Sequence, residues 1–185
     1  MRKVVATSFT SLDGVISDPG SWQGPWFDED AQRLSRERLF AADDLLLGRA
    51  TYVMFGESWP GMPDETGFVD RINGLPKHVV SSTLEEATWG PARIVRPEDL
   101  VAAVTELKSG DGGDILVYGF GRLAHSLLEN GLLDVAELWF HPVLVGATGE
   151  DDLLARRGSK HPMRLESVEK TGSGVLVCSY APSSE

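Results

Sequence analysis

The sequence is poor in cysteine and in clustered positive charge, and both shortages exclude classes of protein. Cys178 is the only cysteine, so no disulfide can form within the chain and no cluster of thiolates can hold zinc. A reducing cytoplasm is therefore the expected location. The formal net charge is −11, and no run of basic residues is longer than Arg156-Arg157. Because nucleic-acid binders need a basic face, we expect neither DNA nor RNA as a partner, and anionic membranes are disfavoured for the same reason.

Long apolar runs are missing as well. No segment approaches the roughly 20 apolar residues of a transmembrane helix. Residues 1–6 carry charge with no long apolar region behind them, so we interpret them as part of a first strand and not as a signal peptide. What remains is an ordinary globular composition, with 42% hydrophobic and 24% charged residues. The length of 185 residues fits a single domain over residues 1–185.

Strand patterns alternate with helix patterns as far as residue 130. Strands are predicted at 4–9, 44–47, 77–81, 92–95 and 114–118, and helices at 28–40, 50–55, 65–73, 97–110 and 122–130. Beyond these, the sequence predicts strands only, with a long extended segment at 135–145 and a hairpin formed by 163–171 and 175–180. We therefore predict a three-layer α/β fold, with a mostly parallel central sheet, an antiparallel C-terminal hairpin and helices on both faces.

A glycine turn is the first feature that carries chemistry. Gly119-Phe120-Gly121 lies between a buried strand and a helix, where unpaired amides and the helix dipole favour a phosphate group. Taken alone, it is equally consistent with a tight turn that needs glycine only for its torsion angles. Residues 119–124 also match the Rossmann fingerprint, which we reject because that fingerprint opens its sheet, whereas this one follows at least four strands.

Two other predicted strand ends carry groups suited to phosphate. Gly48-Arg49-Ala50-Thr51 offers a guanidinium and a hydroxyl beside backbone amides, and Ser81-Ser82-Thr83 offers three hydroxyls. Each is more simply explained as an ordinary loop when considered alone. Three such sites at the ends of three strands are more informative than one, because open α/β sheets bind ligands at this edge.

The order of these motifs resembles the dihydrofolate reductase superfamily, and most closely the C-terminal reductase domain of the bifunctional riboflavin-biosynthesis deaminase–reductase. The resemblance spans residues 3–180. Its markers are Ser11-Leu12-Asp13-Gly14-Val15-Ile16, Leu46-Leu47-Gly48-Arg49-Ala50-Thr51-Tyr52, Val79-Val80-Ser81-Ser82, Val117-Tyr118-Gly119-Phe120-Gly121-Arg122-Leu123 and the stretch from Gly131 to Gly146.

The resemblance implies NADPH as the cofactor. Arg49 and Thr51, with Ser81 and Ser82, would hold the adenosine 2′-phosphate and nearby phosphates. The pyrophosphate would be lined by Gly119, Gly121, Arg122 and Leu123, and the nicotinamide would lie near Ala6, Ile16 and Ser17. Gly48 and Phe120 complete the expected cofactor residues. Arg49 is the only obvious cation at the site of the 2′-phosphate.

The catalytic and substrate residues follow the family pattern less closely. Dihydrofolate reductase has a carboxylate on its first helix, and the matching position falls near Ala31 or Gln32. Asp28 and Asp30 lie about one helical turn earlier and are the candidate catalytic residues if the helix start is shifted. The candidate substrate residues are Asp13, Trp26, Phe27 and His141, with Trp22 and Trp59 as further aromatic candidates. For any one aromatic residue, core packing is the simpler explanation.

The expected function is NADPH-dependent reduction of a small heterocycle, with the riboflavin-type ribosylaminopyrimidine as the first substrate. Dihydrofolate reduction and a non-catalytic nucleotide-binding module are the alternatives. The sequence has no Cys-x-x-Cys and no His-x-Glu of a zinc deaminase. Its four histidines lack metal-ligand spacing, so no metal is expected. The apolar segment Val135 to Val145 would be either buried inside the sheet or paired in part with a second subunit, with Trp139 and Phe140 on opposite faces. We predict a homodimer.

Overall fold

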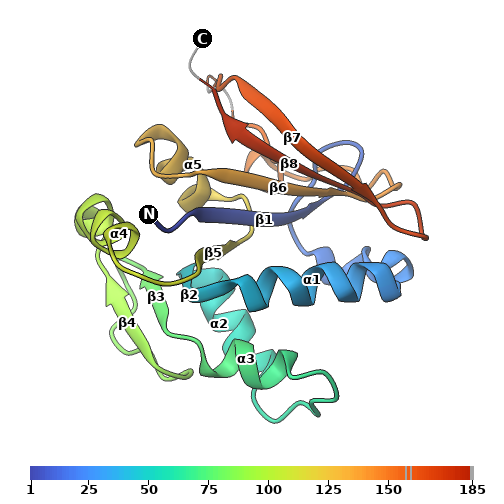
Figure 1. Ribbon diagram of the computed structural model, residues 1–185. Coiled ribbons are helices and arrows are strands. Elements are labelled where there is room, and N and C mark those ends of the chain that lie inside the picture. The colour runs from blue at the N-terminus through green and yellow to red at the C-terminus, as the bar shows by residue number, and fades with distance from the viewer. Residues whose placement is uncertain (157, 159, 184–185) are drawn as a thin grey trace.

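The computed structural model describes residues 1–156, 158 and 160–183, and this part of the chain forms an eight-stranded sheet. The strand order is β4-β3-β2-β5-β1-β6-β8-β7. The strands are β1 (Val4–Thr10), β2 (Ala42–Gly48), β3 (Lys77–Val80), β4 (Ala92–Val95), β5 (Asp114–Tyr118), β6 (Val135–Phe140), β7 (Met163–Lys170) and β8 (Leu176–Pro182). Strands β1 to β6 pair in parallel, whereas β8 pairs antiparallel with both β6 and β7. The mostly parallel sheet with its C-terminal hairpin is confirmed (Figure 1).

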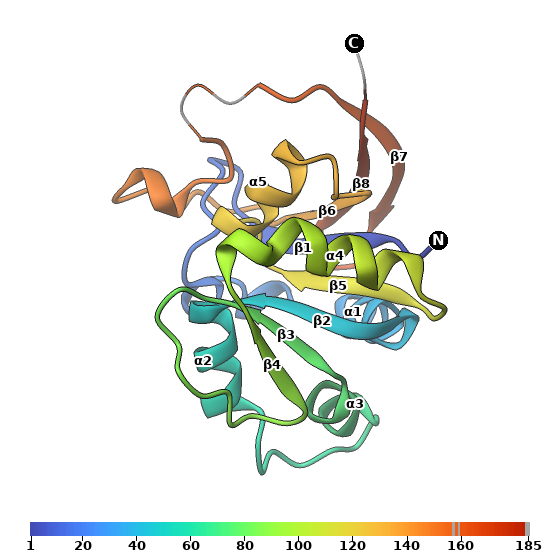
Figure 2. The ribbon, with the colours of Figure 1, turned by 90° about the vertical axis from the view of Figure 1, so that its left-hand side faces the viewer.

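Helices cover both faces of the sheet, which confirms the three layers. Helices α1 (Glu29–Ala41), α2 (Arg49–Ser58) and α3 (Phe68–Gly74) lie on one side, and α4 (Leu100–Ser109) and α5 (Arg122–Glu129) lie on the other (Figures 1 and 2). Short 3₁₀ turns occur at Pro19–Ser21, Gly24–Trp26, Pro97–Asp99 and Glu150–Asp152. Because strand side chains alternate between faces, Leu45 and Leu47 pack toward α1 to α3, and Leu46 packs toward α4 and α5. All three leucines are buried, as expected for a central parallel strand.

Two predicted boundaries are wrong for local reasons. Strand β6 ends at Phe140 and does not continue to residue 145. The His141 amide donates to Thr10 O at 2.8 Å, and the chain then leaves the sheet at Pro142, which has no amide hydrogen to continue the ladder. Helix α3 begins at Phe68, three residues later than predicted. The Asp64 carboxylate accepts the amides of Thr66 and Gly67, and so holds this stretch in a turn.

The structure also changes the basis of the predicted dimer. Strand β6 lies between β1 and β8, so its apolar sequence is explained by burial inside the sheet. Trp139 and Phe140 do point to opposite faces, but both pack against their own chain. The exposed edge is β7, where Leu165 and Val168 are each 50% exposed, beside Leu176 of β8, which is 41% exposed.

Candidate functional site

The predicted cofactor residues follow strands whose carboxyl ends share one edge of the sheet. Gly48 ends β2, Ser81 follows β3, and Gly119 follows β5. These strands are parallel and consecutive in the order β3-β2-β5, so the three motifs lie beside one another. Open α/β sheets bind ligands at this edge, particularly where the chain leaves adjacent strands toward opposite faces. Here α2 follows β2 on one face and α5 follows β5 on the other.

The starts of α2 and α5 have the same design. Gly48 is the N-cap of α2 and Arg49 is its first residue, while Gly121 is the N-cap of α5 and Arg122 is its first residue. Within the described chain, no side chain caps either helix. The amides of each first turn, the positive end of each helix dipole and one guanidinium are therefore combined at two adjacent strand ends. Such a pair of helix starts fits a ligand with two or more phosphate groups.

The glycines of these turns leave room for a ligand. A Cβ atom built on Gly48, Gly119 or Gly121 would meet no described atom within 4 Å. Gly119 has a φ of 89°, which favours glycine for conformational reasons too. The Phe120 side chain is buried against the His125 ring, and Leu123 packs on the core. At Phe120 and Leu123, the backbone and not the side chain is therefore suited to cofactor contact.

A second cation lies beside the predicted 2′-phosphate residues. Arg96 follows β4, and its Nη1 donates to Ser81 O at 2.9 Å and to Leu84 O at 3.1 Å. The Ser81 hydroxyl accepts the Thr83 and Leu84 amides, while Ser82 and Arg49 are exposed and Thr51 is half-buried. Arg96 was not among the residues predicted from the sequence. Its position at a strand end, directly before the Pro97 turn, was the available signal.

The loop after β1 is held by carboxylates. The Ile16 amide donates to Asp152 O at 2.7 Å, and the Ser17 hydroxyl bonds the Asp152 carboxylate. Ala6 is buried in the middle of β1. The Asp13 carboxylate accepts the Ser11 hydroxyl at 2.6 Å and the amides of Val145 and Gly146. These hydrogen bonds lower the pKa of Asp13 to about 2, and the bond from Ser11 has the largest effect. Asp13, which we predicted to contact substrate, therefore anchors two loops.

Asp28 and Asp30 are also bound to the protein backbone. Asp28 caps α1 by accepting the Ala31 amide at 2.9 Å, and it accepts the Ser173 amide at 2.6 Å. Asp30 accepts the Gly172 amide at 3.0 Å. Both carboxylates thus tie the β7–β8 hairpin to the start of α1. The bond from the Ala31 amide is the main cause of the lowered pKa of Asp28, so this group is a poor proton donor.

Aromatic side chains close over the end of β6. His141 is 1% exposed, and its ring meets those of Phe9, Trp22 and Trp26 edge to face, with centroids 5.1, 5.3 and 6.4 Å away. Burial lowers the pKa of His141, so the ring is neutral, and we assign Nδ1 as the donor to Trp139 O at 2.8 Å. Phe27 joins this group through Phe9, at 6.2 Å. Trp59 does not belong to it and packs on Phe55 and Phe68.

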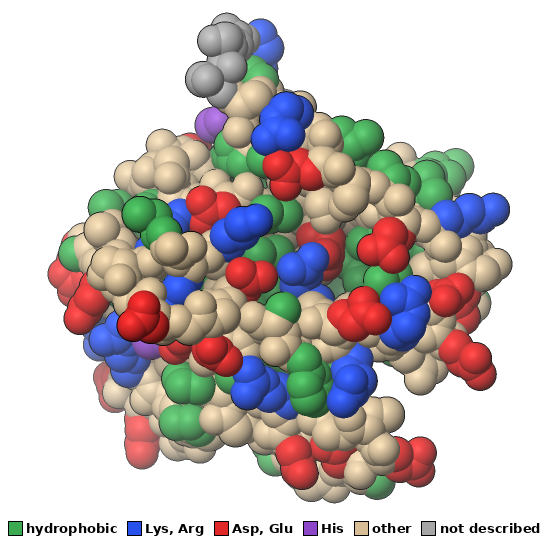
Figure 3. Space-filling model, in the orientation of Figure 1, with side chains coloured by type: hydrophobic (Ala, Val, Ile, Leu, Met, Phe, Trp, Pro, Cys, Tyr) green, Lys and Arg blue, Asp and Glu red, His purple; other side chains and the backbone are tan. Residues whose placement is uncertain are grey.

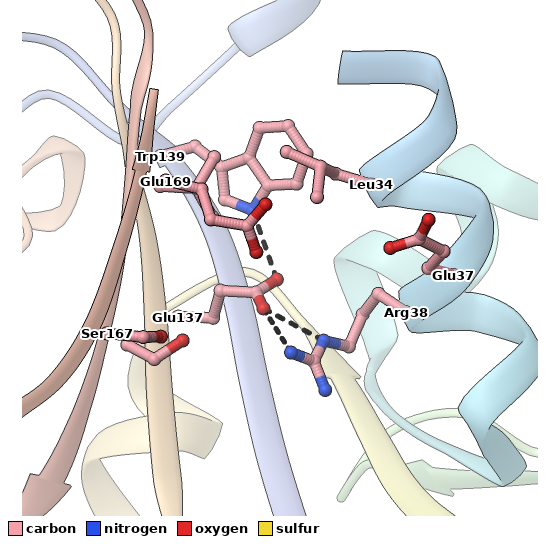
Figure 4. Close-up of a pocket in the computed structure, with 9 residues that line it drawn as sticks. Leu34, Glu37, Arg38, Glu137, Trp139, Ser167 and Glu169 are labelled. Atoms are coloured by element: carbon pink, nitrogen blue, oxygen red, sulfur yellow. Dashed lines mark hydrogen bonds and ion pairs between the residues drawn. The ribbon is translucent and has the colours of Figure 1, made fainter. Parts of the chain in front are cut away.

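A separate cavity of about 190 Å³ lies between α1 and strands β6, β8 and β7 (Figure 4). None of its described lining residues belongs to the predicted site. On its floor, the Glu137 carboxylate accepts Thr7 Oγ1 at 3.0 Å, Trp139 Nε1 at 3.1 Å and Arg38 Nε at 2.9 Å. Arg38 reaches Glu137 from α1 with a second nitrogen as well. Glu137 is fully engaged in joining α1 to the sheet.

The charge is mixed on one face of the molecule. In Figure 3, Lys and Arg side chains are interspersed with Asp and Glu over the face shown. Within the described ranges, no group of three or more His, Cys, Asp or Glu side chains could hold a metal ion. No helix in the part of the chain that the structure describes is long and apolar enough to span a membrane.

Comparison with known proteins agrees with this architecture. The sequence model of the RibD C-terminal domain family matches residues 2–177. The chain belongs to the RibD C-terminal domain family. A curated relative, the uncharacterized protein YyaP of Bacillus subtilis strain 168, is 26% identical over 148 residues, which are 78% of this chain and 77% of YyaP.

Solved structures share the fold of this RibD C-terminal domain at low identity. A pyrimidine reductase-like protein from Corynebacterium diphtheriae is 14% identical, with a TM-score of 0.69 over 100% of this chain and 93% of the other. A diaminohydroxyphosphoribosylaminopyrimidine deaminase/5-amino-6-(5-phosphoribosylamino)uracil reductase from Thermotoga maritima is 16% identical, with a TM-score of 0.64 over 98% of this chain and 57% of the other. At these identities the likeness establishes the fold alone.

Proposed function

We propose that this protein is an NADPH-dependent reductase of a small heterocycle, of the riboflavin-pathway type that acts on 5-amino-6-(5-phosphoribosylamino)uracil. The observation that carries this proposal is the pair of glycine-capped helix starts at the adjacent strands β2 and β5. Membership of the RibD C-terminal domain family supports it, and a structural relative named for this reductase activity shares the fold. The cofactor would supply the hydride, and the protein would supply binding and orientation.

The cofactor phosphates would lie across the two helix starts. The pyrophosphate would contact the backbone of residues 119–123 and the Arg122 guanidinium, in the space left open beside Gly119 and Gly121. The adenosine 2′-phosphate would lie near Arg49, Thr51 and Ser82, with Arg96 holding the adjoining loop through Ser81 O. An arginine at this place favours the 2′-phosphate, because a guanidinium offers several donors to phosphate oxygens.

The substrate would lie beside the nicotinamide, near the aromatic group that covers His141. Flat heterocycles stack well on such rings, and Trp22, Trp26 and Phe27 come from the loop that precedes α1. Dihydrofolate is a weaker candidate. The position that matches its binding carboxylate falls near Ala31, which is buried against Trp139 and Val177, or Gln32, and neither side chain is a carboxylate. Asp28 and Asp30 are bound to the hairpin.

The cofactor preference tests the proposal directly. We expect the wild-type protein to bind NADPH more tightly than NADH in a calorimetric titration, and Arg49→Ala to remove most of this preference. A hydrogen bond to a charged group contributes about 1.5–3 kcal/mol, which corresponds to about a 10- to 150-fold change in affinity. Equal affinities of the wild type for NADPH and NADH would contradict the assignment of this phosphate site.

Turnover separates the enzyme from the non-catalytic alternative. NADPH oxidation should be followed at 340 nm with ribosylaminopyrimidine, dihydrofolate and simple carbonyl compounds as substrates. Oxidation with the pyrimidine supports the proposed substrate, and oxidation with dihydrofolate supports the second candidate. Tight NADPH binding without oxidation of any of these compounds would favour the nucleotide-binding module.

The homodimer and the cytoplasmic location stay predictions. We propose that the contact surface is formed by the edge strand β7 and its neighbour β8, where Leu165, Val168 and Leu176 are exposed, and not by β6. An exposed apolar edge strand invites pairing with another chain, and a second copy of this chain is the expected partner.

A further inference from the structure

Residues 150–154, which we call the strap, connect two elements that the proposed function assigns to the cofactor. On one side the strap is bonded to the loop beside the nicotinamide. The Ile16 amide donates to Asp152 O at 2.7 Å, the Leu154 amide donates to Gly14 O at 2.8 Å, and Val15 forms an antiparallel bridge with Leu153.

On its other side the strap is bonded to α5. Arg122 Nη2 donates to Asp151 Oδ2 at 2.9 Å, and His125 Nε2 lies 3.0 Å from Leu154 O. The strap therefore joins the helix start assigned to the pyrophosphate to the loop assigned to the nicotinamide. These two elements lie far apart in the sequence.

The Asp151 carboxylate occupies the guanidinium that a cofactor phosphate would need. Its other oxygen lies 3.5 Å from Arg156 Nη2, so two guanidinium groups face one carboxylate. The bond to Asp151 raises the pKa of Arg122, and the same bond lowers the pKa of Asp151. The first turn of α5 contains no acidic residue of its own. Asp151 is thus the described carboxylate that competes directly with a phosphate for Arg122.

A phosphate group can replace Asp151 as the partner of Arg122. The Arg122 and Asp151 side chains are 77% and 70% exposed, and exposed pairs of this kind are weak. A pyrophosphate would bring more negative charge than one carboxylate, and it would reach the first-turn amides as well.

We propose that Asp151 is a gate on the cofactor site, which holds Arg122 in the free protein and yields it to the pyrophosphate when NADPH binds. This inference rests on the proposed function. The exchange breaks the Arg122–Asp151 bond between α5 and the strap. Because the strap is bonded to Gly14, Val15 and Ile16, pyrophosphate binding is coupled to the loop beside the nicotinamide. Asp151 acts through Arg122 and the strap, and is a positioning residue.

The test is NADPH affinity in the Asp151→Asn variant, which keeps the size of the side chain and removes its charge. We expect about two- to fivefold tighter binding, as for the loss of one exposed competing ion pair. The gain should shrink at high salt, because exposed charges are screened. Asp111→Asn is the matched control, since Asp111 is an exposed aspartate that precedes β5 at the opposite edge of the sheet. Its affinity should equal that of the wild type.

A double-mutant cycle with Arg122→Ala measures whether Asp151 affects NADPH affinity through Arg122, which a merely structural role of Asp151 would not require. In the Arg122→Ala background, Asp151→Asn should have no effect on NADPH affinity. Asp151→Ser repeats the measurement should Asn itself perturb the strap. If Asp151→Asn binds NADPH no more tightly than the wild type, if Asp111→Asn gains equally, or if the gain persists without Arg122, the gate is refuted while the proposed function stands. If the wild type binds neither NADPH nor NADH, both proposals fail together.

Discussion

Replacing Gly121 with valine distinguishes a phosphate site from a plain turn, because the folded protein has room for the new side chain. Gly121 has φ −82° and ψ −153°, an extended conformation that any residue adopts. A Cβ atom built there meets no described atom within 4 Å. Valine is a poor N-cap residue, so the substitution should lower the free energy of unfolding by about 1 kcal/mol. We expect the melting temperature to fall by about 2–4 °C.

The effect of Gly121→Val on binding should be far larger. Its two methyl groups would enter the open space beside the first-turn amides of α5, where the pyrophosphate is proposed to lie. Loss of two hydrogen bonds to charged oxygens, at about 1.5–3 kcal/mol each, weakens binding by about 3–6 kcal/mol. This corresponds to a loss of affinity of more than about a hundredfold.

The measurement is a calorimetric titration with NADPH, accompanied by a thermal melt followed by circular dichroism. Gly74→Val is the matched control, because Gly74 also has open surroundings and an ordinary φ, but lies at the end of α3. It should leave NADPH affinity unchanged. A folded Gly121→Val protein that binds NADPH within threefold of the wild type would refute the reasoning and leave only a tight turn.

Three further predictions concern stability and assembly. Burial lowers the pKa of Lys77 from its ordinary 10.5 to about 8; the unfolded chain then binds the proton more strongly, so the free energy of unfolding should rise by up to about 3 kcal/mol between pH 8 and pH 10.5. Urea unfolding at several pH values checks this, and Lys77→Met should flatten the rise. Asp28→Ala should lower the melting temperature by several degrees, because it uncaps α1 and releases the hairpin; a loss of turnover with an unchanged melting temperature would instead restore its catalytic role. The wild type should sediment as a dimer and Leu165→Glu as a monomer, and a wild-type species near 20.1 kDa would show the dimer prediction to be wrong.

The sequence predicts well the bounds of short buried strands and the edge of the sheet at which the motifs after them lie. The strands at 92–95 and 114–118 have the observed bounds, because their apolar runs are short and bounded by turn residues. Parallel pairing then brings every strand-end motif to one edge. Gly48, Ser81 and Gly119 were therefore placed together without knowledge of any contact between them. Arg96 belonged to the same edge by the same argument.

The roles of the carboxylates could not be predicted in this way. Asp13 and Asp28 lie between β1 and α1, and Asp30 lies in the first turn of α1. At these places an acidic residue is as suited to substrate as to structure. Their partners are amides of the segments 145–146 and 172–173. Residue 145 was predicted to end an extended segment, and residues 172–173 to lie in a hairpin turn. Neither pattern indicates which carboxylate these amides meet.

The same reasoning bears on where a proton for the reduction could come from. Near the aromatic group that covers His141, Asp28 accepts two amides, and the neutral His141 ring donates to Trp139 O through Nδ1. Ala31 or Gln32 stands where a dihydrofolate reductase has its carboxylate, and neither side chain is an acid. A substrate that needs a protein acid at that point is therefore poorly served. A substrate in which the oxygen or nitrogen beside the hydride-accepting carbon takes its proton from solvent fits these residues better than one that needs a carboxylic acid of the protein.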